Sequence, residues 1–350
     1  MIVTQSNDHK KDNDVTAKKD MLTNRPVAPR NYSAGRRRVT YYLSMSFPAE
    51  TRADLGDRDH RFAALSEARR TFYPDLERFS DPQKYDQGIA GTLGMFFDDF
   101  DTSRALFEET TGQSVPWYLR VDRSGELMPI DERLLEDTDT LVVLSTDHAR
   151  TRQRPNVGEV QAIRKFLARE GTRLVICPHH DVGATDDWPT REIEHFHHGD
   201  AIVSGQERFS GFARALFTTL GIPVENRFAL NPALVKGTKE PVPLSIRGDL
   251  DARGLLRGVT TFNRHMHLPH YAITSQDTKG AVVLAQQAIN PEASPHPFVD
   301  AGNREFNALV WLPPADKRAG EVLVVDQTVF LSQFGGKESL WRFWQNLAKW

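Results

Sequence analysis

Two short apolar runs flank a helical pattern in the segment TLVVLSTDHARTRQRPNVGEVQAIRKFLAREGTRLVIC, residues 140–177. The runs Thr140–Ser145 and 173–177 are rich in valine, isoleucine and leucine and are apolar on both faces. Such runs are typical of strands inside a parallel sheet. Between them, Asn156 and Glu159 have the spacing of a helix-capping box ahead of an apolar stripe. The segment therefore predicts a strand, a helix and a second strand parallel to the first.

Similar patterns extend this unit along the chain. We expect further strands at residues 39–47, 92–97, 117–121, 200–204, 281–285, 307–312 and 321–326, and amphipathic helices at 206–220 and 337–350. Strands that alternate with helices favour a three-layer α/β fold, in which helices cover both faces of a mostly parallel sheet. Residues 222–300 are rich in proline, and we expect an irregular, partly antiparallel insertion there.

The first 38 residues differ in composition from the rest of the chain. They hold nine Lys/Arg against four Asp/Glu and have no periodic apolar face. We therefore expect a disordered basic arm at residues 1–38 and one α/β domain over residues 39–350.

The composition excludes several classes of protein. The 350 residues are 39% apolar, carry a formal charge of -3 and include one cysteine, Cys177. These values argue against a disordered chain, an intrachain disulfide and a strongly basic nucleic-acid binder. No apolar run approaches the roughly 20 residues of a membrane span. We expect a cytoplasmic protein whose partner is a small polar molecule or another protein.

Polar side chains follow three of the expected strands. Asp98 and Asp99 follow the run at 92–97, while Asp147 and His148 follow Thr140–Ser145. The run at 173–177 leads into a third polar group, which consists of Cys177, Pro178, His179, His180 and Asp181. Ligands of such sheets bind beyond the carboxyl ends of the strands, so we expect these groups to meet at one edge. Asp98, Asp99 and Asp181 are candidate ligand-binding carboxylates, although Asp98 and Asp99 could also cap a helix.

The turn Ile176-Cys177-Pro178-His179-His180-Asp181 resembles the nucleophile elbow of class I glutamine amidotransferases. The order of expected elements before it is also similar, and the resemblance covers roughly residues 92–220 and 320–350. In that family the cysteine attacks the glutamine amide, a later histidine activates the cysteine, and a glutamate orients the histidine. The resemblance implies an amidotransferase-like fold with Cys177 at the elbow position.

The sequence departs from the family pattern at three places. Pro178 lacks the backbone N–H that would hold the oxyanion, and residues 145–148 lack the family's glycine pair. The stretch 325–330 contains no histidine. The C-terminal pattern, an expected strand at 321–326, the stretch 328–332 and a helix that ends at 344–347, is similar to the non-catalytic amidotransferase-like domains of trehalose-utilisation-type proteins and of soluble domains that accompany transport and gliding systems. This implies that a small polar ligand or a partner protein binds at the carboxyl ends of the strands.

Two enzymatic alternatives stay open. In the first, His179, His180 and Asp181 bind a divalent metal such as zinc, with Asp147 or His148, in a metal-dependent hydrolase. This turn is similar to the Pro-His-Pro-Asp-Asp turn of zinc-dependent sugar deacetylases. In the second, Cys177 is the nucleophile of an amidase, in which Asp147 and His148 are further catalytic candidates.

Two other histidine groups remain outside this edge. We expect His195, His197 and His198 to lie in a polar loop. We expect His265, His267 and His270 to lie on an alternating strand whose imidazoles face solvent.

Overall fold

The computed structural model describes residues 22–51, 82–147, 151–179, 209–262, 264–265, 268–274, 280–290, 292, 296–316, 318–332 and 334–350. The helices are α2 (Phe47–Thr51), α5 (Pro82–Thr111), α6 (Glu132–Glu136), α7 (Val157–Leu167), α9 (Gly211–Leu220), α10 (Pro297–Asp300) and α11 (Lys337–Lys349), with a 3-10 turn η4 (Gln327–Phe330). The strands are β1 (Val39–Ser46), β2 (Trp117–Val121), β3 (Thr140–Ser145), β4 (Arg173–Pro178), β5 (Val224–Leu230), β6 (Ser245–Ile246), β7 (Leu268–Ile273), β8 (Val282–Ala288), β9 (Glu305–Leu312) and β10 (Glu321–Val325).

The main sheet is mixed, with a parallel half and an antiparallel half. Its strand order is β2-β1-β3-β4-β10-β9-β8-β6. The strands from β2 to β10 are parallel, whereas β9, β8 and β6 extend the sheet with antiparallel pairs. The strands β5 and β7 form a separate antiparallel pair. The predicted α/β class, with a mostly parallel sheet at its centre, is confirmed.

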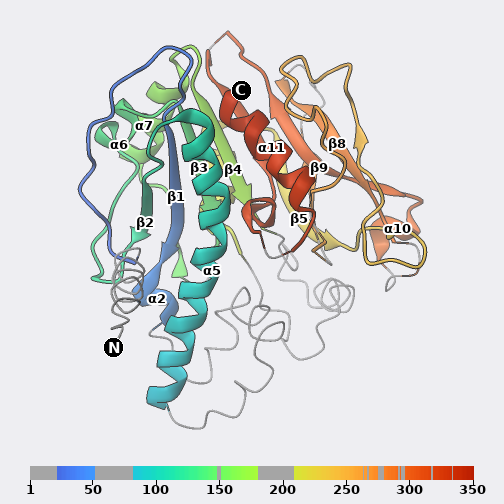
Figure 1. Ribbon diagram of the computed structural model, residues 1–350, viewed down its shortest axis with the longest axis horizontal. Coiled ribbons are helices and arrows are strands. Elements are labelled where there is room, and N and C mark those ends of the chain that lie inside the picture. The colour runs from blue at the N-terminus through green and yellow to red at the C-terminus, as the bar shows by residue number, and fades with distance from the viewer. Residues whose placement is uncertain are drawn as a thin grey trace, which may run out of the picture.

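Helices cover both faces of the sheet, which gives the three layers (Figure 1). On one face, apolar residues of α5 and α11 join one core cluster with the sheet, and the two helices contact each other. On the other face, α6, α7 and α9 share the second cluster. Residues of β1, β3 and β4 are buried along their whole length because both faces are covered.

The predicted capping box at α7 is confirmed. Asn156 accepts a hydrogen bond from the backbone N–H of Glu159, and the Glu159 carboxylate accepts one from the N–H of Asn156. Glu159 also pairs with Arg120 of β2 and accepts a hydrogen bond from the N–H of Ile130. The cap therefore joins α7 to β2 as well as starting the helix.

The run at 92–97 lies in helix α5, so the predicted strand there is wrong. Phe97, Phe100 and Phe107 recur at helical spacing, and all three are buried against the sheet. A short apolar run cannot by itself distinguish a buried helix from a strand. Strand β1, next to the edge strand β2, lies between β2 and β3. The strand predicted at 200–204 lies outside the described residues.

Residues 22–38, the second half of the expected disordered arm, pack along the sheet. Leu22 is buried, and the side chain of Asn24 exchanges two hydrogen bonds with the backbone of Leu119. The Arg30 guanidinium donates to the carbonyl of Val39 at 2.7 Å. The expected disorder is therefore wrong for this half of the arm, whereas residues 1–21 lie outside the described residues.

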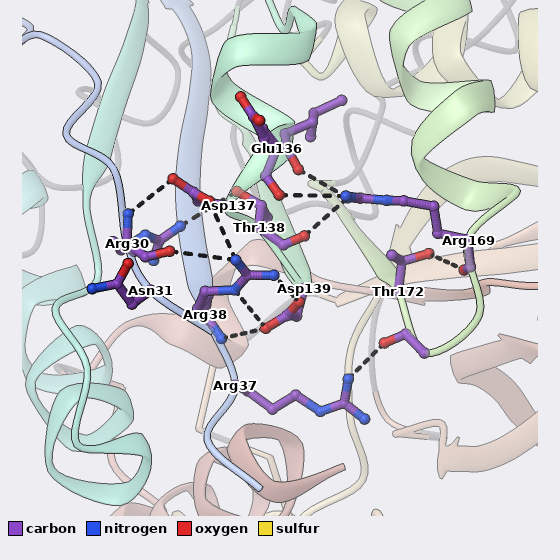
Figure 2. Close-up of polar contacts among 12 residues, drawn as sticks. Arg30, Asn31, Arg37, Arg38, Glu136, Asp137, Thr138, Asp139, Arg169 and Thr172 are labelled. Atoms are coloured by element: carbon purple, nitrogen blue, oxygen red, sulfur yellow. Dashed lines mark hydrogen bonds and ion pairs between the residues drawn. The ribbon is translucent and has the colours of Figure 1, made fainter. Parts of the chain in front are cut away.

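Arg38 lies at the centre of a polar network at the amino edge of the sheet (Figure 2). Its guanidinium donates to both oxygens of Asp139, at 2.8 and 3.1 Å, and its backbone N–H donates to Asp139 as well. Asp137 accepts from the Arg38 side chain and from the N–H of Arg30. Burial alone would raise the pKa of Asp139. The hydrogen bonds from Arg38 outweigh burial and hold this pKa below its usual range.

We expect Arg38→Ala to lower the free energy of unfolding by about 2 kcal/mol, because it leaves the half-buried Asp139 without its main partner. The Asp139 pKa is lowered in the folded state, so this contribution exists above pH ~4 and fades as pH falls below that value. Urea unfolding of both proteins at pH 7 and at low pH measures the difference.

The control is Arg133→Ala, which removes a solvent-exposed pair with Asp131. We expect this control to change stability by less than about 0.5 kcal/mol. An Arg38→Ala protein as stable as the control at pH 7 would contradict the anchoring role of the network.

Candidate functional site

Buried polar residues gather at the carboxyl ends of β1, β3, β4 and β10. The group consists of Ser44, Ser145, Thr146, Asp147, His179, Ser210, Asn226, Asp326, Gln327 and Thr328, each with at most 7% of its surface exposed. Burial of so many polar groups is costly unless they bond to one another or to a ligand. We call this group the carboxyl-edge cluster.

Asp147, a predicted site residue, joins three elements through its carboxylate. Oδ1 accepts hydrogen bonds from Ser44 Oγ of β1 at 2.6 Å and from Ser145 Oγ of β3 at 2.7 Å. Oδ2 accepts from the backbone N–H of Phe212 in the first turn of α9, at 3.0 Å. Burial raises the pKa of this carboxyl despite these bonds. Asp147 therefore holds the start of α9 against the sheet, a structural role that satisfies both its oxygens.

Ser210 connects the ends of β3 and β4 from the start of α9. Its hydroxyl donates to the carbonyl of Ser145 and accepts from the backbone N–H of His179, both at 2.7 Å. Its backbone is left-handed, with φ 63°, an uncommon conformation for a residue other than glycine. Such backbone positions persist where surrounding contacts enforce them, and they occur preferentially at functional sites.

His179 follows β4 and pairs with Asp326, the residue after β10. Its Nδ1 lies 2.9 Å from Oδ1 of Asp326, and both side chains are buried. The hydroxyl of Thr328 donates to the other carboxylate oxygen. The His265 ring packs edge-on against the His179 ring, with 5.3 Å between centroids. A carboxylate oxygen accepts a hydrogen bond from an imidazole N–H, so this contact sets the tautomer and orientation of the ring.

The antiparallel pair β5–β7 holds the end of β4 in place. Asn226 and Tyr271 face each other across these two strands. Asn226 Nδ2 donates to the carbonyl of His179 at 2.6 Å, and Tyr271 Oη donates to the carbonyl of Pro178 at 3.2 Å. The insertion expected at 222–300 therefore contributes directly to the carboxyl-edge cluster.

Three buried polar atoms of the carboxyl-edge cluster have no hydrogen-bond partner within the described part of the chain. They are Oγ1 of Thr146, Oδ1 of Asn226 and Oε1 of Gln327. Thr146 and His179 directly follow Ser145 and Pro178, the last paired residues of β3 and β4, and Gln327 follows Asp326. Asn226 is bonded to His179 through its other side-chain atom. Buried polar atoms usually have a partner, so these three mark a place where a further molecule can bind.

A cavity of about 510 Å³ lies between α9 and β5 and reaches Asn226. Arg214, Thr218 and Glu225 supply polar groups to its wall, and Phe217 supplies part of the apolar surface. The volume falls in the range of about 300–1,000 Å³ that is usual for small-ligand sites.

Cys177 is fully buried at the end of β4, in the core cluster shared with α5 and α11. Burial raises the pKa of its thiol well above the usual range, and the nearby Asp326 carboxylate raises it further. A thiol in these surroundings stays protonated at neutral pH. The cysteine at the predicted elbow position is therefore part of the core packing.

Asp98 and Asp99 lie on helix α5. The prediction that they follow a strand is therefore wrong. Burial, together with the charge of Asp98, raises the pKa of Asp99 to about 6. His148, His180 and Asp181 lie outside the described residues. Within the described ranges, no three metal-ligating side chains come close enough together to hold an ion.

Two histidines expected to face solvent are buried, so that expectation is wrong for them. His265 packs on His179 and on Phe334, with 4.4 Å between its ring centroid and that of Phe334. His270 in β7 accepts a hydrogen bond from the N–H of Asn307. Burial lowers the pKa of His270 to about 4, and the charges of Arg227 and His296 contribute to this shift. His267 and the group from His195 to His198 lie outside the described residues.

Sequence reasoning missed several members of the carboxyl-edge cluster. Asp326, Gln327 and Thr328 directly follow a buried strand, which is the same signal that identified Asp147. Asn226 and Ser210 carry no such signal, because they reach the sheet edge from other elements.

Comparisons with known proteins add little to this geometry. No family model and no curated protein matches the chain. One solved structure, described as "mmIFT52 N-terminal domain", is similar over 69% of this chain and 85% of its own, with 10% identity and a TM-score of 0.37. A likeness at this TM-score carries no argument about fold or function. In the part of the chain that the structure describes, no helix has the length and apolarity to cross a membrane.

We expect Asp147→Ala to lower the free energy of unfolding by about 2–4 kcal/mol, because the N–H of Phe212 and two serine hydroxyls lose their acceptor. The raised folded pKa means that ionisation of Asp147 opposes folding, so wild-type stability falls as pH rises through that pKa. Asp147→Asn should remove this part of the pH dependence. Urea unfolding across the acidic and neutral range measures both effects.

The control is Asp249→Ala on the exposed surface, which should leave the unfolding midpoint unchanged. Equal stability of Asp147→Ala and this control would disprove the anchoring role of Asp147.

We expect the Cys177 thiol to react with iodoacetamide far more slowly in the native protein than in urea at pH 7.5, because it is buried and protonated. Mass spectrometry of the alkylated protein follows the reaction. Alkylation in the native state as fast as that of free cysteine would instead indicate an activated thiol.

Proposed function

We propose that this chain is an amidotransferase-like α/β domain without amidotransferase activity, which binds a small polar ligand at the carboxyl ends of β3, β4 and β10. The observation that carries the proposal is a set of three buried oxygens in the carboxyl-edge cluster that have no partner among the described residues, in the same cluster as the His179–Asp326 pair. A ligand that bonds to them would satisfy atoms whose burial otherwise costs free energy.

The chemistry of these atoms indicates what kind of ligand fits. Asn226 and Gln327 each present an amide oxygen, which accepts hydrogen bonds, and Thr146 presents a hydroxyl. The nearby carboxylates of Asp147 and Asp326 disfavour an anion. The preferred ligand is therefore a neutral molecule rich in O–H or N–H donors, such as a polyol, a sugar or a primary amide.

The surroundings of Cys177 support a binding role over amide hydrolysis. Its thiol is fully buried with a raised pKa, and Pro178 has no N–H with which to hold an oxyanion. The described histidine nearest in the chain, His179, is paired through Nδ1 with Asp326.

One observation favours the metal-dependent hydrolase as a second candidate. A metal-binding histidine commonly donates its other ring N–H to a carboxylate, as His179 does to Asp326. The other expected ligands, His180 and Asp181, lie outside the described residues. Metal analysis after zinc reconstitution distinguishes the candidates: stoichiometric zinc that is lost in His179→Ala would favour the hydrolase.

The ligand proposal is tested by thermal denaturation with a panel of sugars, polyols and primary amides, followed by calorimetric titration of each compound that raises the melting temperature. We expect Thr146→Val and Gln327→Met to fold at least as stably as the wild type, because each removes an unpartnered buried oxygen. Both variants should bind the compound at least about five-fold more weakly, a loss of about 1 kcal/mol.

The matched control is Thr219→Val on the exposed surface of α9, which should bind with wild-type affinity. The proposal fails if no compound of the panel raises the melting temperature. It fails equally if a compound that does so binds Thr146→Val and Gln327→Met as tightly as the wild type.

A further inference from the structure

A second cavity lies at the opposite, amino edge of the sheet, where β4 and β10 begin. Its volume is about 430 Å³, and three arginines contribute to its wall: Arg37, Arg173 and Arg253. Arg173 and Glu321 are the first residues of their strands and face each other in the parallel register. We call this cavity the amino-edge pocket.

Arg173 is a buried guanidinium without a polar partner. The residue is 3% exposed, and its Nε and Nη1 have no hydrogen-bond partner within the described residues. Its guanidinium carbon lies 4.7 Å from the ring centroid of Trp350, which covers one face of the group. Among the described residues, the buried indole N–H of Trp350 has no hydrogen-bond partner either. Every unpartnered group on this stacked pair is therefore a hydrogen-bond donor.

Glu321, the nearest carboxylate on the sheet, is bonded to other groups. Its Oε1 accepts from Arg253 at 2.9 Å, and its Oε2 accepts from the indole of Trp311 at 3.2 Å. The second carboxylate at the pocket, Glu170, belongs to an exposed residue. The wall of the amino-edge pocket therefore contains three arginines and two glutamates. Among the described residues, no carboxylate forms a hydrogen bond with the Arg173 guanidinium.

The other two arginines are held beside the pocket. Arg37 donates to the carbonyl of Gly171 at 2.6 Å, which fixes its guanidinium close to the start of β4 (Figure 2). Arg253 is half-exposed, pairs with Glu321 and also contributes to the pocket wall. Several guanidinium groups in one wall are an arrangement that recognises oxyanions, because guanidinium groups match carboxylate and phosphate geometry.

We propose that the amino-edge pocket binds the oxyanion group, phosphate or carboxylate, of a small molecule, with Arg173 as its principal ligand. The pocket is larger than a single phosphate needs and falls in the usual size range of small-ligand sites. This site is separate from the carboxyl-edge cluster and offers the opposite chemistry, donors and positive charge in place of acceptors and carboxylates.

The test uses the full chain with sodium phosphate and sodium acetate as probes and sodium chloride at equal ionic strength as the reference. We expect at least one oxyanion to raise the melting temperature above that in chloride. The probe that gives the larger rise distinguishes a phosphate-bearing from a carboxylate-bearing ligand. Calorimetric titration then gives the affinity.

Arg173→Met removes the charge while keeping a long side chain that can pack on Trp350. We expect it to bind the effective anion at least ten-fold more weakly, and to be no less stable than the wild type in chloride, because an unpaired buried charge is removed. Arg253→Ala, at the half-exposed side of the pocket, provides a second variant if Arg173→Met fails to fold, and should also bind more weakly. Arg257→Ala, an exposed arginine on the same loop as Arg253, is the matched control and should bind normally.

The proposal is overturned if phosphate and acetate stabilise the wild type no more than chloride does. It is also overturned if a stabilising anion binds Arg173→Met, or Arg253→Ala where only that variant folds, with the affinity of the Arg257→Ala control.

Discussion

The buried carboxylate of Asp147 is the contact on which the carboxyl edge of the sheet depends. It accepts hydrogen bonds from β1, from β3 and from the first turn of α9, so one side chain sets where that helix begins relative to the sheet. The position of α9 places Ser210 between the ends of β3 and β4. Ser210 in turn holds the backbone of His179, the residue that meets Asp326. The geometry of the carboxyl-edge cluster thus follows from satisfying the hydrogen bonds of one buried carboxyl group.

The two edges of the parallel strands have opposite polar character. Around His179, the unpartnered buried atoms are two amide oxygens and a hydroxyl, with carboxylates nearby. Around Arg173, they are guanidinium and indole donors, with further arginines nearby. A molecule suited to one edge is therefore poorly suited to the other. The strands β4 and β10 contribute to both edges, so the same pair of strands connects the two proposed sites.

Much of the central architecture could be predicted from local sequence patterns. The strands at 140–145 and 173–177, and the capping box at Asn156 and Glu159, all depend on residues close together in the chain. The strand predicted at 92–97 is wrong because the run is too short to show its period, and its place within a long helix is visible only in the structure. Residues 22–38 have no local apolar pattern that predicts order. They are held by hydrogen bonds to partners far away in the sequence, such as Asp137 and Asp139.

The sequence by itself determined the α/β class, the buried parallel strands and the presence of polar residues where those strands end. These features follow from the periodicity of apolar residues and from local capping, which act over a few positions. Only the tertiary structure decided which polar residues meet. His179 and Asp326 are 147 positions apart, and Arg173 lies near the middle of the sequence whereas Trp350 is its last residue. Such pairings depend on strand order and helix placement, which arise from the packing of the whole core.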